Sequence, residues 1–177
     1  MKNEKVKKSP LNEDSSLQKK IANRQSHSRC VLFVCTGNMC RSPMAEYLLR
    51  HHLGADSLWT VCSAGLFAVN GASVSPPAIE VMNEKGIDLS GHRTRCLTQE
   101  IVDSATVIVV MSTSHVREMK SRFHEAQDKV FLLKSFSNHS FGENVRDPIG
   151  SSVYIYRMIR DEIDNILLDL ILYLKSL

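Results

Sequence analysis

Long hydrophobic runs are absent from this sequence of 177 residues. No stretch approaches the roughly 18 consecutive apolar residues that a membrane-spanning helix needs. The first residues also lack the apolar core that marks a secretion signal. We therefore expect no membrane span and a cytoplasmic location.

A disulfide framework is also missing. The five cysteines are an odd number, and Cys35 and Cys40 fall within one short loop. Cysteines used in this way are typical of a reducing compartment. The histidines show no spacing with cysteines or carboxylates that indicates a metal site, so we predict neither a metal nor a cofactor.

The net positive charge of this sequence is lower than is typical of proteins that bind nucleic acid. The formal charge is +3, and residues 1–29 hold eight Lys or Arg against three Asp or Glu, a surplus of +5 that leaves residues 30–177 at −2. This balance argues against a nucleic-acid partner. A local site must attract any anionic substrate, because the overall field does not.

Hydrophobic patterning divides the chain into two parts. Residues 1–29 are polar and have no period that would bury one face, which predicts a flexible basic tail. Residues 30–177 show no internal repeat and are predicted to form one domain. Apolar runs predict strands at 31–34, 58–62, 105–111 and 130–133, and helices are expected from Ser42, from Pro76 or Pro77, at about 114–123 and at about 153–174. This alternation predicts a three-layer α/β fold, with a four-stranded parallel sheet and helices on both faces.

The loop after the first predicted strand has the features of an anion-binding site. It reads Cys35-Thr36-Gly37-Asn38-Met39-Cys40-Arg41-Ser42, and Pro43 then favours the start of a helix. Backbone N–H groups at a helix N-terminus bind phosphate, and Gly37 is expected to supply backbone freedom. Arg41 adds a planar guanidinium whose paired N–H groups can donate to two phosphate oxygens. The same positive field favours a thiolate, so Cys35 is the candidate nucleophile.

Attack on phosphorus also requires a proton donor for the leaving group. The candidate is Asp147, because Pro148 biases it to an extended conformation in a segment that reads as a loop. A carboxylic acid in this place can protonate the leaving group and then activate water.

These motifs, over about residues 30–174, resemble the low-molecular-weight protein tyrosine phosphatase family. The resemblance rests on the loop with Pro43-Met44-Ala45-Glu46, on Ser63-Ala64-Gly65, on the stretch from Gly86 to Arg93, and on Asp147-Pro148. It implies a flavodoxin-like fold of the phosphotyrosine phosphatase I type. It also implies hydrolysis of phosphorylated protein substrates through a phosphocysteine intermediate.

The resemblance further implies a role for each residue of the site. Cys35 is then the nucleophile, Arg41 the phosphate clamp, and Asp147 the general acid and later the base. Phosphate is held by the loop residues Thr36, Gly37, Asn38, Met39, Cys40, Arg41 and Ser42. Asn38 braces the loop with help from Ser63 and His92, and the Ser42 hydroxyl steadies the Cys35 thiolate.

Two sequence cues for the substrate conflict. Tyrosine-specific members carry aromatic residues directly after the Asp-Pro, whereas Ile149 and Gly150 follow here, and residues 147–152 resemble the protein-arginine phosphatase branch. That branch, however, has Thr at the position of Met39. The large apolar Met39 favours an aromatic leaving group, so we expect phosphotyrosine, with phosphoarginine as the alternative.

Two other functions fit the loop less well. A thioredoxin-coupled arsenate reductase needs two further cysteines for a disulfide relay, but Cys96 stands alone in the corresponding region. A non-catalytic phosphate-binding module would not need Cys35, Arg41 and Asp147 together. Cys40 either traps an oxidised Cys35 as a disulfide or packs beneath the loop. The sequence leaves this point and the oligomeric state open.

Overall fold

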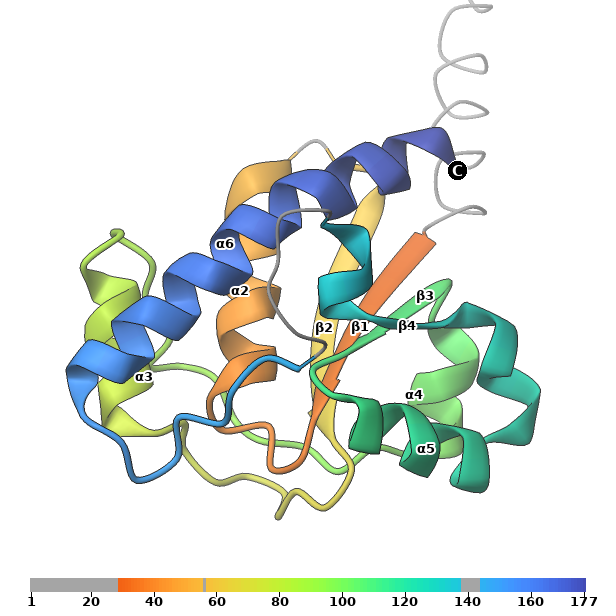
Figure 1. Cartoon of the computed structure of the whole chain (residues 1–177), viewed down its shortest axis with the longest axis horizontal. Coiled ribbons are helices and arrows are strands. Elements are labelled where there is room, and N and C mark those ends of the chain that lie inside the picture. The colour runs from red at the N-terminus through yellow and green to blue at the C-terminus, as the bar shows by residue number, and fades with distance from the viewer. Residues whose placement is uncertain (1–28, 56, 138–143) are drawn as a thin grey trace, which may run out of the picture.

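Four parallel strands form one sheet in the spatial order β2-β1-β3-β4 (Figure 1). The computed structural model describes residues 29–55, 57–137 and 144–177. The strands are β1 (Arg29–Cys35), β2 (Trp59–Gly65), β3 (Val107–Val110) and β4 (Val130–Leu132). The predicted four-stranded parallel sheet is therefore confirmed.

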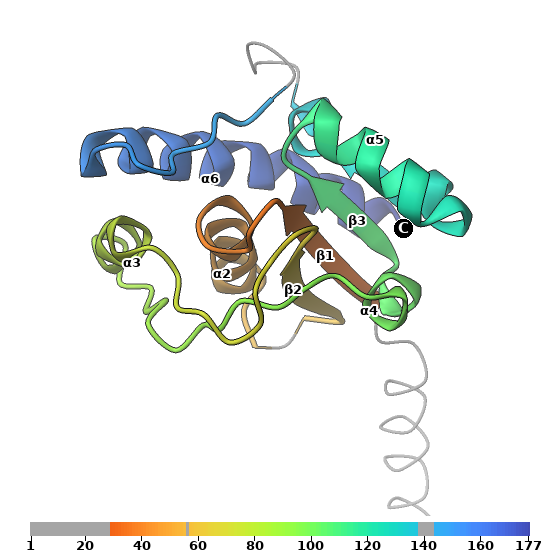
Figure 2. The ribbon, with the colours of Figure 1, turned by 90° about the horizontal axis from the view of Figure 1, so that it is seen from below.

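Helices cover both faces of this sheet, which confirms the three-layer α/β prediction (Figure 2). The helical elements are α2 (Arg41–Leu53), α3 (Pro76–Asn83), α4 (Gln99–Ser104), α5 (Thr113–Arg122), α6 (Val153–Ser176), and the 3₁₀ turns η1 (His124–Lys129) and η2 (Leu133–Phe136). Alternation along β1 divides the core between the two faces. Val31 and Phe33 pack with α2, α3 and α6, while Leu32 and Val34 pack with α4 and α5.

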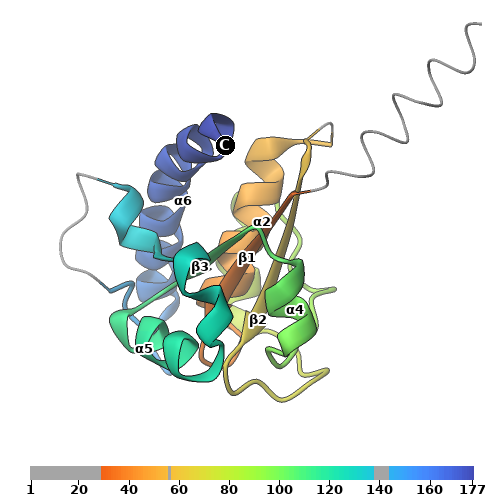
Figure 3. The ribbon, with the colours of Figure 1, turned by 90° about the vertical axis from the view of Figure 1, so that its right-hand side faces the viewer.

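Helix α6 shows how the sequence pattern produces this packing. Its buried residues recur every three or four positions, which places them on one face of a helix: Ile159, Ile163, Ile166, Leu170 and Leu174. This face lies against α2, which packs on the sheet (Figure 3), and against α3.

The structure corrects some predicted boundaries. Helix α2 begins at Arg41 rather than at Ser42, and the short α4 was not predicted. Six residues contain less than two full turns, so α4 leaves too little periodicity to detect. The predicted basic tail falls outside the described residues except for Arg29, which opens β1. Among the described residues, no helix is both long and apolar enough to span a membrane.

The carboxyl end of β1 is the point where distant segments meet. The loop from Cys35 to Cys40 connects β1 with α2, and the backbone after β2 binds it directly. Leu66 N–H donates to the Cys35 carbonyl at 2.9 Å, and Phe67 N–H donates to the Thr36 carbonyl at 2.9 Å. Ligands of parallel α/β sheets bind at this edge.

Candidate active site

Asn38 gives the loop its sharp turn. Its φ of 55° lies in the left-handed region, whereas the φ of Gly37 does not. The expectation that Gly37 supplies the backbone freedom is therefore wrong. Asn tolerates this conformation better than most residues, because its short polar side chain forms local hydrogen bonds.

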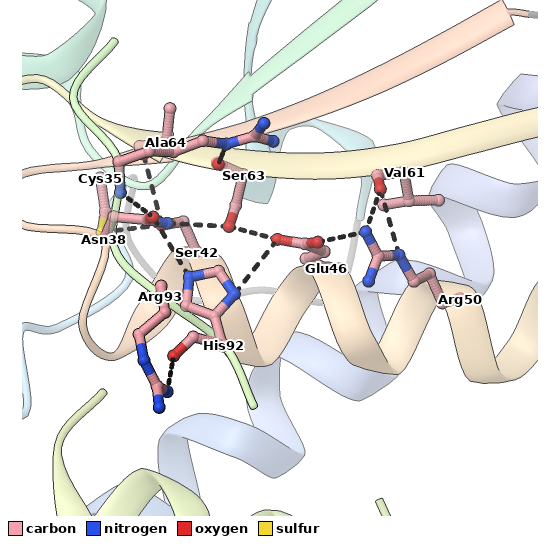
Figure 4. Close-up of polar contacts among 11 residues, drawn as sticks. Cys35, Asn38, Ser42, Glu46, Arg50, Val61, Ser63, Ala64, His92 and Arg93 are labelled. Atoms are coloured by element: carbon pink, nitrogen blue, oxygen red, sulfur yellow. Dashed lines mark hydrogen bonds and ion pairs between the residues drawn. The ribbon is translucent and has the colours of Figure 1, made fainter. Parts of the chain in front are cut away.

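The buried Asn38 amide is held at both ends (Figure 4). Its Nδ2 donates to Ser42 Oγ at 3.0 Å and to Ser63 Oγ at 2.8 Å. Its Oδ1 lies 3.2 Å from His92 Nε2 and accepts the Arg95 backbone N–H at 3.1 Å. Both donors and both acceptor positions of the amide are thus used, which fixes the loop conformation. Ser63 and His92, which resemblance alone had suggested, lie where they can brace Asn38.

A buried carboxylate extends this network away from the loop. Ser63 donates to Glu46 Oε2, and Glu46 also forms an ion pair with Arg50 (Figure 4). Glu46 is 3% exposed, and burial raises the pKa of its carboxyl. The sequence motif contained Glu46, but nothing in the sequence indicated that it supports the loop from α2.

The Cys35 thiol lies next to the Ser42 hydroxyl. The distance between Cys35 Sγ and Ser42 Oγ is 3.0 Å. Because Asn38 Nδ2 donates to Ser42 Oγ, the Ser42 proton is left for an acceptor, either the sulfur or the more distant Ala64 carbonyl at 3.5 Å. The helix was expected from Ser42, but Cys40 is the N-cap residue, and the Ser42 side chain lies against the thiol.

Asp147 reaches the loop from the segment before α6. Its Oδ2 forms an ion pair with Arg41, whose other terminal nitrogen donates to the Val145 carbonyl at 3.3 Å. Asp147 Oδ1 accepts the Ile149 backbone N–H at 3.2 Å, which orients the carboxylate. A cavity of ≈ 180 Å³ is lined by Cys35, Thr36, Gly37, Met39, Cys40, Arg41, Asp147 and Ile149. The structure therefore brings the three predicted catalytic residues to one cavity.

Cys40 contacts partners beneath the loop. Its Sγ lies 3.2 Å from Ser75 Oγ and 3.3 Å from the Tyr156 hydroxyl. Burial raises the pKa of the Cys40 thiol, and burial also raises the pKa of Tyr156 to about 12. In this reduced state Cys40 packs under the loop. Tyr154 and Tyr156 both belong to α6.

His115 is a site residue that sequence reasoning missed. Its Nε2 lies 3.0 Å from Thr36 Oγ1, and its Nδ1 is buried with no hydrogen-bond partner among the described residues. Burial, with help from Arg41, lowers the pKa of His115 to about 4. The topology offered a signal: His115 follows β3, whose carboxyl end shares an edge with that of β1.

The two buried histidines predict a fold that weakens in mild acid. Burial, together with neighbouring arginines, lowers the pKa values of His92 and His115 to about 4. An unfolded histidine has a pKa of about 6.5, so below this pH the unfolded chain binds protons first. The free energy of unfolding should therefore fall as pH drops from about 6.5 to about 4, by up to roughly 3 kcal/mol for each histidine. Urea unfolding at several pH values measures this loss.

Histidine substitution separates this effect from the titration of carboxylates. Against the wild type, His92→Gln with His115→Gln should flatten the decline in the free energy of unfolding between about pH 6.5 and 4. Equal slopes for the two proteins would contradict burial of neutral histidines.

Known proteins match this chain over nearly all of its described length. A family model described as low molecular weight phosphotyrosine protein phosphatase matches residues 30–177. The protein-arginine-phosphatase of Bacillus subtilis strain 168 is 41% identical over 147 residues, covering 82% of this chain and 97% of the relative. A probable low molecular weight protein-tyrosine-phosphatase, EpsP of Ralstonia nicotianae, is 37% identical over 136 residues, covering 77% and 92%.

Solved structures agree with these sequence matches. The YwlE arginine phosphatase from Geobacillus stearothermophilus superposes with a TM-score of 0.77 at 40% identity. The superposition covers 84% of this chain and 94% of that structure. The chain therefore belongs to the low molecular weight phosphotyrosine protein phosphatase family, whose members are cysteine-dependent enzymes.

Proposed function

We propose that this protein is a protein-tyrosine phosphatase that acts through a phosphocysteine intermediate. The observation that carries the proposal is the meeting of Cys35, Arg41 and Asp147 in one cavity at the N-terminus of α2. The loop and helix N-terminus supply backbone N–H groups for the phosphoryl oxygens. Arg41 supplies a guanidinium for two of them.

The reaction then has two displacements at phosphorus. Cys35 Sγ attacks the phosphoryl group, the bond between phosphorus and the tyrosine oxygen breaks, and Asp147 gives that oxygen its proton. In the second step Asp147 takes a proton from water, which attacks the phosphocysteine and releases phosphate. The Ser42 hydroxyl, 3.0 Å from Cys35 Sγ, stabilises the thiolate at the start and end of the cycle.

The cavity walls support a phosphotyrosine substrate. Met39 and Ile149 present apolar side chains to the cavity. An aromatic ring gains from apolar contact, whereas a guanidinium leaves its N–H donors unpaired against such walls.

Phosphoarginine is the second candidate substrate. The Bacillus subtilis and Geobacillus stearothermophilus relatives, which are named as arginine phosphatases, share 41% and 40% identity with this chain. No aromatic residue directly follows Asp147-Pro148. If the phosphoryl group recruits Arg41, Asp147 is released and can accept a hydrogen bond from a guanidinium.

Met39→Thr tests which substrate the cavity selects. The ratio of kcat/KM for phosphotyrosine over phosphoarginine peptides should exceed one in the wild type. It should fall by at least about tenfold in Met39→Thr, since changes of this size in an apolar pocket alter discrimination by about 10–200-fold. Steady-state kinetics on two peptides of otherwise identical sequence provide the ratio.

Met158→Thr is the matched control, because Met158 is exposed on α6 and does not line the cavity. It should leave the ratio unchanged. A wild type that prefers phosphoarginine would overturn the tyrosine assignment, and an unchanged ratio in Met39→Thr would show that Met39 does not discriminate.

We also propose that the protein works in the reducing cytoplasm on phosphorylated proteins. All five cysteines are free thiols, and they include the proposed nucleophile. A thiolate nucleophile needs a compartment that keeps it reduced.

A further inference from the structure

A second pair of cysteines lies on the opposite face of the sheet from the phosphate loop. Cys30 on β1 pairs in register with Thr60, and Cys62 on β2 pairs with Leu32, so both thiols project from the face that Leu32 shares with α4 and α5. The distance between Cys30 Sγ and Cys62 Sγ is 3.5 Å. Cys35, by contrast, belongs to the core on the α2 side.

The two thiols of this pair are close together and are reached by solvent. Both cysteines are half-buried, so a small oxidant reaches them from solvent. A disulfide needs the sulfurs about 2.05 Å apart, which leaves about 1.5 Å to be closed. On its other side, Cys30 N–H donates to Thr106 Oγ1 at 3.1 Å, and the Cys30 carbonyl accepts the Thr106 N–H at 2.8 Å. Cys30 lies opposite Thr60 and is therefore offset by two positions from Cys62, so closure takes side-chain rotation together with a shift at the start of β1.

We propose that Cys30 and Cys62 form a peroxide-reactive thiol pair that closes to a disulfide between β1 and β2. Cys30 begins as the thiolate and attacks one oxygen of hydrogen peroxide, which breaks the O–O bond, gives a sulfenic acid and releases hydroxide. Hydroxide takes the Cys62 proton and becomes water, and the Cys62 thiolate attacks the sulfenic sulfur and expels hydroxide. This second hydroxide becomes water by taking up the proton that Cys30 released to solvent when it ionised. Overall, two thiols and one peroxide give one disulfide and two waters.

The electrostatics assign different roles to the two sulfurs. The hydrogen bond from Cys62 is the largest effect and lowers the pKa of Cys30 to about 6, against burial, which raises it. Thr60 and Arg95 lower the pKa by smaller amounts, and Glu46 raises it. The same hydrogen bond and burial raise the pKa of Cys62. Cys30 is therefore the attacking thiolate at neutral pH, and Cys62 is the resolving thiol.

Peptide mapping of the full chain tests the disulfide directly. Trypsin cuts after Arg29 and Arg41, which leaves Cys30, Cys35 and Cys40 in one peptide. The protein is therefore prepared with Cys35→Ser and Cys40→Ser and treated with hydrogen peroxide. We expect a Cys30 peptide joined to the Cys62 peptide, lighter than their sum by two hydrogens and separated again by dithiothreitol.

Cys96 serves as the internal control, because among the described residues its thiol forms a hydrogen bond only with the Leu97 carbonyl and not with another cysteine. It should remain open to alkylation after the peroxide treatment. Failure to find the cross-link, or a link to Cys96 instead, would overturn the proposal. Since the readout is a mass and not turnover, the result is independent of the proposed phosphatase activity.

Cys62→Ala in the same background tests the roles of the two sulfurs. Without a resolving thiol, Cys30 should oxidise past the sulfenic acid to a product that dithiothreitol does not reverse. Alkylation of Cys30 by iodoacetamide should be half-maximal near pH 6 when Cys62 is present, and at a higher pH in Cys62→Ala. Identical alkylation profiles would overturn the assignment of Cys30 as the attacking thiolate.

Discussion

Asp147→Asn should lower kcat on phosphotyrosine peptides by about 10²–10⁴-fold, which is the usual contribution of a positioned general acid. Asn keeps the size of the side chain but has no proton to give to the tyrosine oxygen and cannot accept one from water. Stopped-flow and steady-state kinetics together measure phosphorylation of Cys35 and its hydrolysis, and both steps should slow.

The leaving group separates proton donation from a merely structural role. 4-Nitrophenolate leaves without full protonation, so Asp147→Asn should impair Cys35 phosphorylation by 4-nitrophenyl phosphate far less than by a phosphotyrosine peptide. Asp147→Asn also removes the ion pair with Arg41. Inhibition by inorganic phosphate measures whether Arg41 still binds phosphate in this variant. Equal impairment of both substrates would argue against Asp147 as the acid.

Asp147 also shows the limit of reasoning from the sequence. Cys35 and Arg41 lie in one contiguous loop between a strand and a helix, so local rules were enough to place them together. Asp147 lies 106 positions from Arg41, and only the family resemblance suggested that it reaches the loop. No local pattern encodes such a contact, because it depends on how α6 packs against α2.

The sequence predicted the fold better than it predicted the contacts that hold the site in place. Continuous apolar runs marked β1 and β3, and the spacing of Ile163, Ile166 and Leu170 marked α6. The supporting contacts, such as those of Glu46 and His115, cross from one element to another. Buried polar side chains of this kind look like ordinary surface residues in a sequence, since their partners appear only after folding.

Gly65 illustrates a backbone constraint that the sequence concealed, and Gly65→Ala tests it. A Cβ on Gly65 would lie 2.7 Å from the Thr36 carbonyl oxygen and 2.8 Å from the Asn38 backbone nitrogen. Gly65 cannot retreat easily, because its N–H donates to Arg95 and its carbonyl accepts from Leu97, at 2.9 Å and 2.8 Å. The phosphate loop must therefore move. A displacement of about 1 Å in such a site lowers catalysis by about 10²-fold.

Gly65→Ala should accordingly lower kcat/KM by about 10²-fold and weaken inhibition by inorganic phosphate, while overpacking lowers the free energy of unfolding by about 1–3 kcal/mol. Gly91→Ala is the matched control: Gly91 is exposed, and a Cβ there meets nothing within 4 Å. Thermal unfolding must show that both variants are folded before the kinetics are compared. If folded Gly65→Ala retains wild-type kcat/KM and phosphate binding, the close approach of β2 does not set the position of the loop. If phosphate binding and kcat/KM fall together in Gly65→Ala but not in Gly91→Ala, contact with the end of β2 determines the conformation of the phosphate loop.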